Sequence, residues 1–316
     1  MLLLTLFSNN MTKILVSGLI NIETTCPIKG FPLDYFPIDY PFNQVKSVIS
    51  GVGYNLVNNL RKLGDSICFC SMVGKDLHGK LIIDELTEKE LSTAHIQPIL
   101  AATPQSVILS APDGRREIYC DLKDYQEATY DFSTAVSAIN DADLIIACNS
   151  NFNRPLLKLA KGLQKPIATD VHVLDDPYNA YNRDFLKNSD ILFLSDEGLK
   201  DKDIKAFVWE IYSFYHNKII VVGCGEQGAI LFEAETKNFT DFPAVYTRPV
   251  VATSGAGDTL FSTFLHFYVK SHDVHQSLFY ATVAASYKIG EAGSSNGFLN
   301  ETDLRKIVSQ IEESNG

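Results

Sequence analysis

The fold prediction depends on one stretch, Val251-Ala252-Thr253-Ser254-Gly255-Ala256-Gly257-Asp258-Thr259. Two glycines follow a pair of valines, and apolar residues at helical spacing then continue to about Lys270. Glycines keep the turn free of side-chain bulk, and the start of a helix offers unpaired N–H groups at the positive end of its dipole. The stretch therefore predicts an anion-binding turn, and phosphate is the usual ligand of such a turn.

Asp258 lies in the first turn of this expected helix. The helix dipole alone can account for an acidic residue there, but it does not account for the two glycines. Phosphoryl transfer would use both features. The amides of Gly255, Ala256 and Gly257 would stabilise charge on the transferred group, and the Asp258 carboxylate would accept the proton of the attacking hydroxyl.

The bulk composition is that of a globular protein. The chain has 316 residues, of which 46% are hydrophobic and 21% charged, enough for one large α/β domain or two modest ones. A net charge of -11 argues against non-specific binding to nucleic acid, which needs clustered lysine and arginine. The six cysteines form no C-x-x-C pair, and we interpret them as reduced thiols.

The amino-terminal residues show no targeting pattern. The apolar run Leu2–Phe7 lacks a basic leader and is too short for a signal sequence or a membrane span. We therefore expect a cytoplasmic protein with no membrane partner. A credible first strand follows directly after Met11, so residues 1–10 are a candidate upstream extension.

Strand-like apolar runs alternate with segments long enough for helices, which predicts an α/β fold with a mostly parallel sheet covered by helices. The expected strands are Ile14–Ser17, Ser66–Met72, Leu144–Ala147, Pro166–Asp170, Ile191–Leu194 and Ile219–Val222. The expected helices are Tyr54–Leu63, Gly79–Leu86, Arg154–Leu163, Ile204–His216, Ala256–Lys270, Val274–Ile289 and Thr302–Ile311.

Two segments interrupt this alternation, at about residues 21–50 and 97–125. The first carries prolines among aromatic residues, and the second is extended around a turn at Pro112-Asp113-Gly114. They are either two surface loops or a small sheet that projects from the main domain. Their aromatic and β-branched content favours the sheet.

A G-x-G-x-x-G pattern at residues 223–228 matches the dinucleotide-binding fingerprint. That fingerprint requires a helix to begin at the glycines, so that the helix amides face the pyrophosphate. Here the glycines are followed by Ala229-Ile230-Leu231-Phe232-Glu233, which has the pattern of a second strand. The pattern therefore predicts a β-hairpin with glycines at its turn, not a nicotinamide or flavin site.

The stretch around Asp258 resembles the carboxyl-terminal signature D-T-x-G-A-G-D of the PfkB/ribokinase family of carbohydrate and nucleoside kinases. Three more segments resemble the family's G-G-x-x-x-N…L-G, V-G-x-D-x-x-G and G-x-x-G motifs in the right order, namely Ser50–Asn55 with Leu63-Gly64, Val73–Gly79 and Gly225–Gly228. The resemblance implies one kinase domain over residues 11–316. We expect a ribokinase-like three-layer sandwich with a mostly parallel central sheet and a small β-lid built from segments 21–50 and 97–125.

The resemblance also implies which residues bind the acceptor. Asn21 and Glu23 occupy positions from which the family contacts substrate hydroxyls, although ribokinase-like members have Asp where Glu23 stands. Gly51, Gly53 and Asn55 fall on the second substrate-contacting stretch. For Asn55 we leave two interpretations open, a sugar contact and a helix N-cap.

On the nucleotide side, the resemblance implies ATP bound with Mg²⁺ beside Gly225, Gly228 and the segment that begins at Ser195. Magnesium in such sites keeps waters and phosphate ligands, and we expect no metal site built by protein side chains. The family's N-x-x-E segment is altered here to Ser195-Asp196-Glu197-Gly198, so Asp196 or Glu197 substitutes for its Glu, or neither does.

Two further positions depart from the family pattern. Ala252 replaces the first Asp of D-T-x-G-A-G-D, which in the family helps to hold an activating monovalent cation, so a potassium requirement is uncertain. Ser50 replaces the first glycine of the G-G pair, where its side chain would crowd the acceptor or hydrogen-bond to it.

We therefore expect Asp258 to be the base of an ATP-dependent kinase that phosphorylates a hydroxymethyl group of a small sugar. One alternative is a nucleoside kinase, in which lid aromatics stack on a base; another is a ligand-sensing relative that has lost turnover. The same aromatics could instead pack lid against lid in a homodimer. They are Phe31, Tyr35, Phe36, Tyr40 and Phe42.

Overall fold

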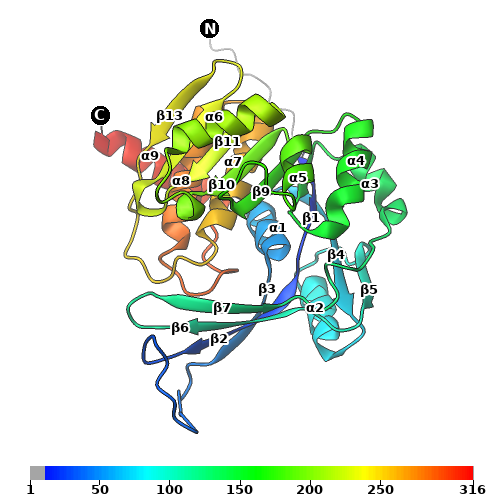
Figure 1. Cartoon of the computed structure of the whole chain (residues 1–316), viewed down its shortest axis with the longest axis vertical. Helices are drawn as coiled ribbons and strands as arrows, with labels where there is room; N and C mark the ends of the chain where they lie inside the picture. The colour runs from blue at the N-terminus through cyan, green and yellow to red at the C-terminus, as the bar shows by residue number, and fades with distance from the viewer. Residues whose placement is uncertain (1–10, 316) are drawn as a thin grey trace.

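The computed structural model describes residues 11–315 and has a nine-stranded sheet at its centre (Figure 1). The candidate upstream extension, residues 1–10, lies outside the described residues. The strands are β1 (Lys13–Ser17), β4 (Ser66–Gly74), β5 (Ile96–Leu100), β8 (Leu144–Ala147), β9 (Ile167–Val173), β10 (Ile191–Ser195), β11 (Ile219–Gly223), β12 (Ala229–Glu233) and β13 (Asn238–Phe242). Their order is β13-β12-β11-β10-β9-β8-β1-β4-β5, and all pairs from β11 to β5 are parallel.

Helices cover both faces of this sheet, which makes the fold a three-layer α/β sandwich (Figure 1). They are α1 (Val52–Leu63), α2 (Leu77–Glu88), α3 (Val136–Asp141), α4 (Arg154–Gly162), α5 (Arg183–Asn188), α6 (Ile204–Tyr215), α7 (Ala256–Ser271), α8 (Val274–Lys288) and α9 (Glu301–Asn315). Neighbouring residues of a strand face opposite sides. Leu15 of β1 therefore joins the apolar cluster under α3–α6, whereas Ile14 and Val16 join the cluster under α1 and α7.

The predicted α/β alternation is confirmed. All six expected strands and all seven expected helices are present, with ends that shift by a few residues. Helices α3 and α5 were not predicted. Each has six residues, which is too few to show a helical period in the sequence.

A second sheet projects from the main body and is called the small sheet below (Figure 1). It has the order β3-β2-β6-β7, and its strands are β2 (Asn21–Pro27), β3 (Lys46–Ser50), β6 (Gln105–Ser110) and β7 (Arg116–Asp121). The predicted turn at Pro112-Asp113-Gly114 connects β6 to β7. One part of the expectation was wrong. Residues 97–100 lie in β5, which pairs in parallel with β4 at the edge of the large sheet and buries Leu100 there.

The G-x-G-x-x-G segment forms a hairpin, as the sequence predicted. Strands β11 and β12 are antiparallel, and residues 225–227 form a short 3-10 turn between them. Gly228 has φ of 100°, which favours glycine. No α-helix begins at these glycines, so the segment cannot bind a pyrophosphate in the dinucleotide manner.

Candidate active site

Helix α7 begins at the glycine turn that the sequence indicated. Gly255 precedes the helix with φ of 79°, a left-handed conformation that favours glycine. A Cβ on Gly255 would lie 2.4 Å from the carbonyl oxygen of Ser294, so the packing of this turn also requires glycine. The loop after α8 therefore supports the turn from beneath.

The first turn of α7 leaves backbone donors open. The N–H of Ala256 donates to the Thr253 carbonyl at 3.2 Å, whereas the N–H groups of Gly257 and Asp258 have no protein acceptor among residues 11–315. Gly257 is exposed, and a Cβ there would meet no atom within 4 Å. An anionic oxygen can therefore approach these two donors, as phosphate binding at a helix N-terminus requires.

The Asp258 carboxylate is held by one side chain from a distant part of the chain. Nδ2 of Asn55, on α1, donates to Oδ2 of Asp258 at 2.7 Å. The N-cap interpretation of Asn55 was wrong, because the N-cap of α1 is Gly51 and Asn55 lies inside the helix. Burial raises the pKa of Asp258, and the Asn55 amide acts in the opposite direction by favouring the carboxylate.

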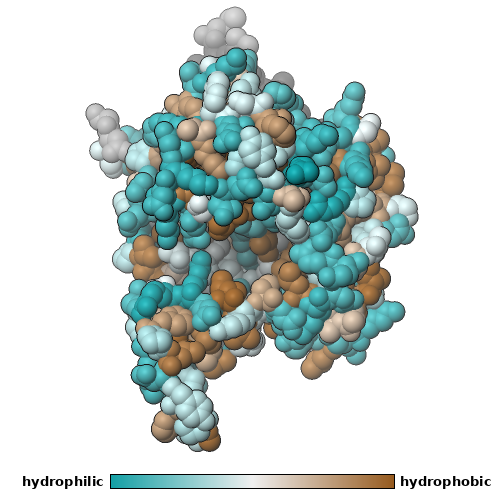
Figure 2. Space-filling model, in the orientation of Figure 1, coloured by the Kyte–Doolittle hydropathy of each residue, from teal (hydrophilic) through white to brown (hydrophobic). Residues whose placement is uncertain are grey.

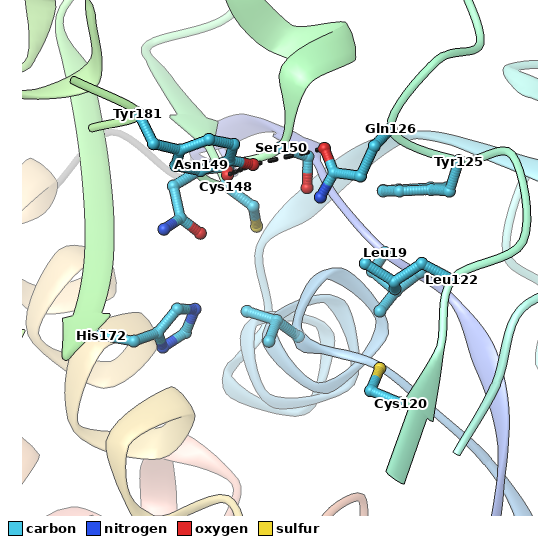
Figure 3. A pocket seen from close by; sticks show the side chains of 11 residues that line it. Leu19, Cys120, Leu122, Tyr125, Gln126, Cys148, Asn149, Ser150, His172 and Tyr181 are labelled. Carbon is cyan, nitrogen blue, oxygen red and sulfur yellow. Dashed lines mark hydrogen bonds between the residues drawn. The ribbon is translucent and has the colours of Figure 1, made fainter. Parts of the chain in front are cut away.

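A cavity of about 380 Å³ opens at the carboxyl ends of β1, β8 and β9, and the end of β7 forms part of its wall (Figure 3). Figure 2 shows the surface hollowed at the centre of this face, between the small sheet and the main body. Figure 3 shows Asn149, Cys148 and His172 facing Leu19 and Leu122 across the opening. The cavity is lined by Leu19, Val52, Cys120, Leu122, Tyr125, Gln126, Cys148, Asn149, Ser150, His172 and Tyr181.

Electrostatics connect this cavity to Asp258. Burial raises the pKa of the Cys148 thiol, and the charge of Asp258 raises it further. Two further groups affect the pKa of Asp258. His172 lowers it, and Asp170, which lies on β9, raises it. Val52, which lines the cavity, lies in the first turn of α1 together with Asn55, which holds Asp258. The cavity and the anion-binding turn therefore belong to one site.

Sequence reasoning missed the residues at the ends of β8 and β9. Cys148, Asn149 and Ser150 follow β8, and His172 lies near the end of β9. The available signal was their position: in an open parallel sheet, ligands bind outside the carboxyl ends of the strands. Both strands were predicted correctly, so the residues that follow them were identifiable as candidates.

The predicted acceptor residues Asn21 and Glu23 lie buried on β2, and neither lines the cavity. Nδ2 of Asn21 donates to Ser106 at 3.0 Å, while its buried Oδ1 has no partner among residues 11–315. The Glu23 carboxylate accepts hydrogen bonds from Ser50 at 2.9 Å and from Ser294 at 3.1 Å. Ser50 therefore hydrogen-bonds within the protein, and substrate contact by Asn21 and Glu23 stays a prediction.

Gly51 and Gly53 allow α1 to approach the chain that follows β1. Gly51 has φ of 108°, and a Cβ there would lie 2.6 Å from the Leu19 carbonyl oxygen. A Cβ on Gly53 would lie 2.7 Å from the carbonyl carbon of Gly18. These contacts explain both glycines by packing, and their contact with substrate stays a prediction.

The residues predicted to bind the nucleotide lie together at the carboxyl ends of β10 and β11. Ser195 ends β10 and pairs in register with Gly223, which leads into the hairpin turn of Gly225 and Gly228. A Cβ on Gly223 would lie 3.8 Å from the side chain of Leu260 in α7, so this hairpin is a neighbour of the anion-binding helix. Nucleotide binding by these residues remains a prediction.

The segment after Ser195 forms a 3-10 turn over Asp196–Gly198. The Ser195 hydroxyl accepts a hydrogen bond from the N–H of Glu197 at 3.2 Å. Burial raises the pKa of Asp196, and the neighbouring charge of Glu197 raises it further. Two carboxylates, Asp196 and Glu197, thus lie next to the residues predicted to bind the nucleotide.

Comparison with known proteins identifies the family. Residues 11–302 match the model of the pfkB family carbohydrate kinases, and the chain belongs to this family. It is 25% identical over 278 residues to the acarbose 7(IV)-phosphotransferase of an Actinoplanes species, covering 87% of this chain and 91% of the relative. It is 22% identical over 323 residues to 5-dehydro-2-deoxygluconokinase of Clostridium botulinum, covering 92% and 94%.

Solved structures share the fold over 95% of this chain. A microbiome-derived acarbose kinase has a TM-score of 0.83 at 23% identity, covering 95% of this chain and 100% of that one. Arabidopsis thaliana ribokinase in complex with ribose and ATP has a TM-score of 0.79 at 21% identity, covering 95% and 99%. The predicted ribokinase-like fold and kinase family are therefore confirmed. No helix within residues 11–315 is long and apolar enough to cross a bilayer.

Proposed function

We propose that this kinase transfers the γ-phosphoryl group of ATP to a hydroxymethyl group of a small sugar, with Asp258 as general base. One observation carries the proposal. Asn55 of α1 holds the Asp258 carboxylate, and Asp258 lies in the first turn of α7, where the N–H groups of Gly257 and Asp258 are open. A base and an anion-binding site therefore lie within two residues of each other, as in-line phosphoryl transfer requires.

In the proposed reaction the acceptor hydroxyl lies in the cavity and attacks the γ-phosphorus. Its proton moves to Asp258 as the new O–P bond forms and the bond to ADP breaks. The open N–H groups at the start of α7 stabilise the charge on the phosphoryl oxygens. Burial of Asp258 makes it a stronger base than an exposed aspartate, since burial raises its pKa.

The donor side rests on the hairpin glycines Gly225 and Gly228 and on Ser195, as the family resemblance implies. Mg²⁺ would accompany the ATP phosphates with water and phosphate ligands. Asp196 and Glu197 are the carboxylates nearest to Ser195 in the chain and are the residues we expect to hold its waters. ATP as the donor, together with six unpaired cysteines, is consistent with the cytoplasm as the compartment.

The acceptor site favours a sugar. Gln126, Asn149, His172 and Tyr181 bring amide, imidazole and phenol groups to the cavity, and these can pair with sugar hydroxyls. The buried Oδ1 atom of Asn55 also lacks a protein partner among residues 11–315. The relatives with acarbose kinase, dehydro-deoxygluconokinase and ribokinase in their names support this substrate class.

The nucleoside alternative loses its main support. It relied on aromatics of the 21–50 segment as stacking platforms, yet none of them lines the cavity, and Tyr35 is 91% exposed. Four of these aromatics are exposed in the loop between β2 and β3, namely Tyr35, Phe36, Tyr40 and Phe42. We propose that this loop packs against the same loop of a second copy, and sedimentation velocity of the wild type and of Tyr35→Ser/Phe36→Ser would test that dimer.

A catalytically impaired sensor remains the other candidate, motivated by Ala252 and the altered Ser195–Gly198 segment. The retained Asp258 opposes it, because a sensor needs no base in its anion-binding turn. Turnover decides between the two candidates.

The test is ADP release from Mg·ATP with a panel of pentoses, hexoses, oligosaccharides and nucleosides. Asp258→Asn should lower kcat by roughly 10²–10⁴-fold while sugar binding persists. Asp273→Asn is the matched control, because Asp273 is only the N-cap of α8 and Asn caps equally well. If Asp258→Asn turned over as fast as the wild type, the mechanism would be wrong. If the wild type bound a sugar without turnover, the protein would be the sensor.

A further inference from the structure

Lys288, the last residue of α8, is a fully buried lysine under the anion-binding turn, with 0% of its surface exposed. Its Nζ donates to the carbonyl oxygen of Gly293 at 2.5 Å. A Cβ on Gly255 would lie 3.1 Å from Cε of Lys288, so the side chain runs directly against the turn that starts α7. The mechanism above does not use this lysine.

Four charged groups influence the pKa of Lys288. They are Asp258 from α7, Glu23 from β2, Glu291 from the loop after α8 and Arg248 from the segment before α7. Burial is the largest influence and lowers the pKa of Lys288 to about 8, while the three carboxylates favour the ammonium form. At neutral pH the group therefore carries a positive charge inside the protein.

Burying an ammonium without full pairing is costly, because the ion loses its hydration. It has three N–H donors, and within residues 11–315 the carbonyl of Gly293 is its one hydrogen-bond acceptor. An apolar side chain of similar length would fill the same space at no such cost. The charge therefore requires an explanation beyond packing.

The same region does not fit the monovalent cation that the family resemblance implies. Ala252 has no side-chain oxygen to offer, and the Ile289 carbonyl already accepts from the N–H groups of Val251 and Ala252 at 2.8 and 3.0 Å. The Gly293 carbonyl is bound to Lys288. A metal cation next to this ammonium would also be repelled by it.

We propose that the Lys288 ammonium is a built-in cation of the anion-binding turn, which takes the place of a diffusible monovalent metal ion. The inference rests on the kinase function proposed above. Lys288 does not touch the reactants and acts as a positioning residue. It places positive charge behind the Gly255 turn, where negative charge develops during phosphoryl transfer.

The first experiment compares wild-type turnover in potassium chloride with turnover in tetramethylammonium chloride of equal ionic strength. We expect kcat to agree within about twofold. We also expect the melting temperature to be equal in the two salts, because a cation that bound only the folded state would raise it. Strong activation by potassium, about tenfold or more, together with a potassium-dependent melting temperature would overturn the proposal.

The second experiment removes the charge. Lys288→Met should lower kcat at least about tenfold with a smaller change in the acceptor KM, because the lost charge acts mainly on the transition state. It should also abolish the alkaline fall in kcat that we expect of the wild type above about pH 8. Lys270→Met is the matched control: Lys270 lies near the end of α7, pairs with Glu301 and should have no effect on turnover.

A third variant keeps the proposal testable if Lys288→Met does not fold. In the double variant Lys288→Ala/Ala252→Asp, the first substitution removes the ammonium and leaves room for a cation, and the second adds a carboxylate. Turnover of this variant should become dependent on potassium. A folded Lys288→Met protein with wild-type kcat would refute the inference. Absence of turnover in every wild-type assay would instead refute the proposed kinase function, so the two failures are distinguishable.

Discussion

Asn55 and Asp258 are 203 residues apart in the chain, and the amide of one holds the carboxylate of the other at 2.7 Å. The bond joins the first turns of α1 and α7, two helices that pack side by side on one face of the large sheet. It connects the amino-terminal glycine motif to the anion-binding turn. The orientation of the proposed base is therefore set by a residue that the sequence suggested for another role.

Replacing Asn55 by leucine should impair turnover by changing the base. The amide favours the ionised form of Asp258, so its loss raises the pKa of Asp258 beyond the effect of burial. The base works only when ionised, and the acid limb of the kcat–pH profile should move to higher pH. We expect kcat at neutral pH to fall by roughly tenfold or more.

Asn59→Leu is the control for this experiment. Asn59 lies one turn further along α1 and donates to Ser262 and Thr263 of α7 at 2.8 and 2.9 Å. Its replacement should lower the melting temperature without moving the acid limb. An equal shift of the limb in both variants would mean that helix packing, and not the Asn55 bond, controls the base.

Gly228→Ala and Gly225→Ala should differ sharply in stability. A Cβ on Gly228 would lie 2.0 Å from the Phe242 carbonyl oxygen at φ of 100°, whereas a Cβ on Gly225 would meet nothing within 4 Å at φ of 54°. We expect Gly228→Ala to lower the free energy of unfolding by about 2–4 kcal/mol and Gly225→Ala by about 1 kcal/mol. Urea denaturation measures both, and similar values would contradict the tight packing of Gly228 against the end of β13.

Arg116 on β7 should help to close the small sheet over the site. Its guanidinium donates to the hydroxyl of Ser254, directly before the anion-binding turn. Arg116→Ala should raise the KM for the acceptor by about three- to tenfold, which corresponds to about 0.6–1.4 kcal/mol. Arg115→Ala is the control, since Arg115 pairs with Asp113 in the turn between β6 and β7.

A double-mutant cycle with Ser254→Ala decides whether this contact is responsible. If the two residues act through one bond, the double variant should have the same acceptor KM as Arg116→Ala alone. Fully additive effects would mean that Arg116 acts elsewhere.

His266, buried in α7, should make stability fall as pH rises above about 6.5. Burial opposes its charged form, but hydrogen bonds with Asp65 at 2.7 Å and Glu301 at 3.1 Å outweigh burial and raise its pKa above 6.5. Its contribution is complete below about pH 6.5 and is lost as pH rises through the folded pKa. The pKa of Glu301 is lowered, so its own contribution is lost only under acid conditions.

Urea denaturation of His266→Gln and wild type across this pH range measures the effect. The difference in free energy of unfolding between the two should shrink as pH rises. His272→Gln is the control, because His272 is exposed at the end of α7. A difference that stays constant with pH would show that His266 is neutral in the folded protein.

Local chemistry accounts for what could be predicted. Apolar β-branched runs such as residues 219–222 form strands of a parallel sheet because both faces of such a sheet are buried. Paired glycines at 255 and 257 predict the anion-binding turn because conformational freedom and lack of bulk are properties of those residues alone. The hairpin at residues 223–228 could likewise be told from a dinucleotide site by the pattern that follows it.

Contacts between distant segments could not be obtained in this way. The cavity is lined from β7, the ends of β8 and β9, and the start of α1. The Asn55–Asp258 bond and the place of Lys288 beneath Gly255 likewise depend on how helices pack on the sheet. A side chain reaches only a few ångströms, so which groups meet depends on how whole helices and strands are placed. The sequence pattern of one element shows its own periodicity and not its position relative to the other elements.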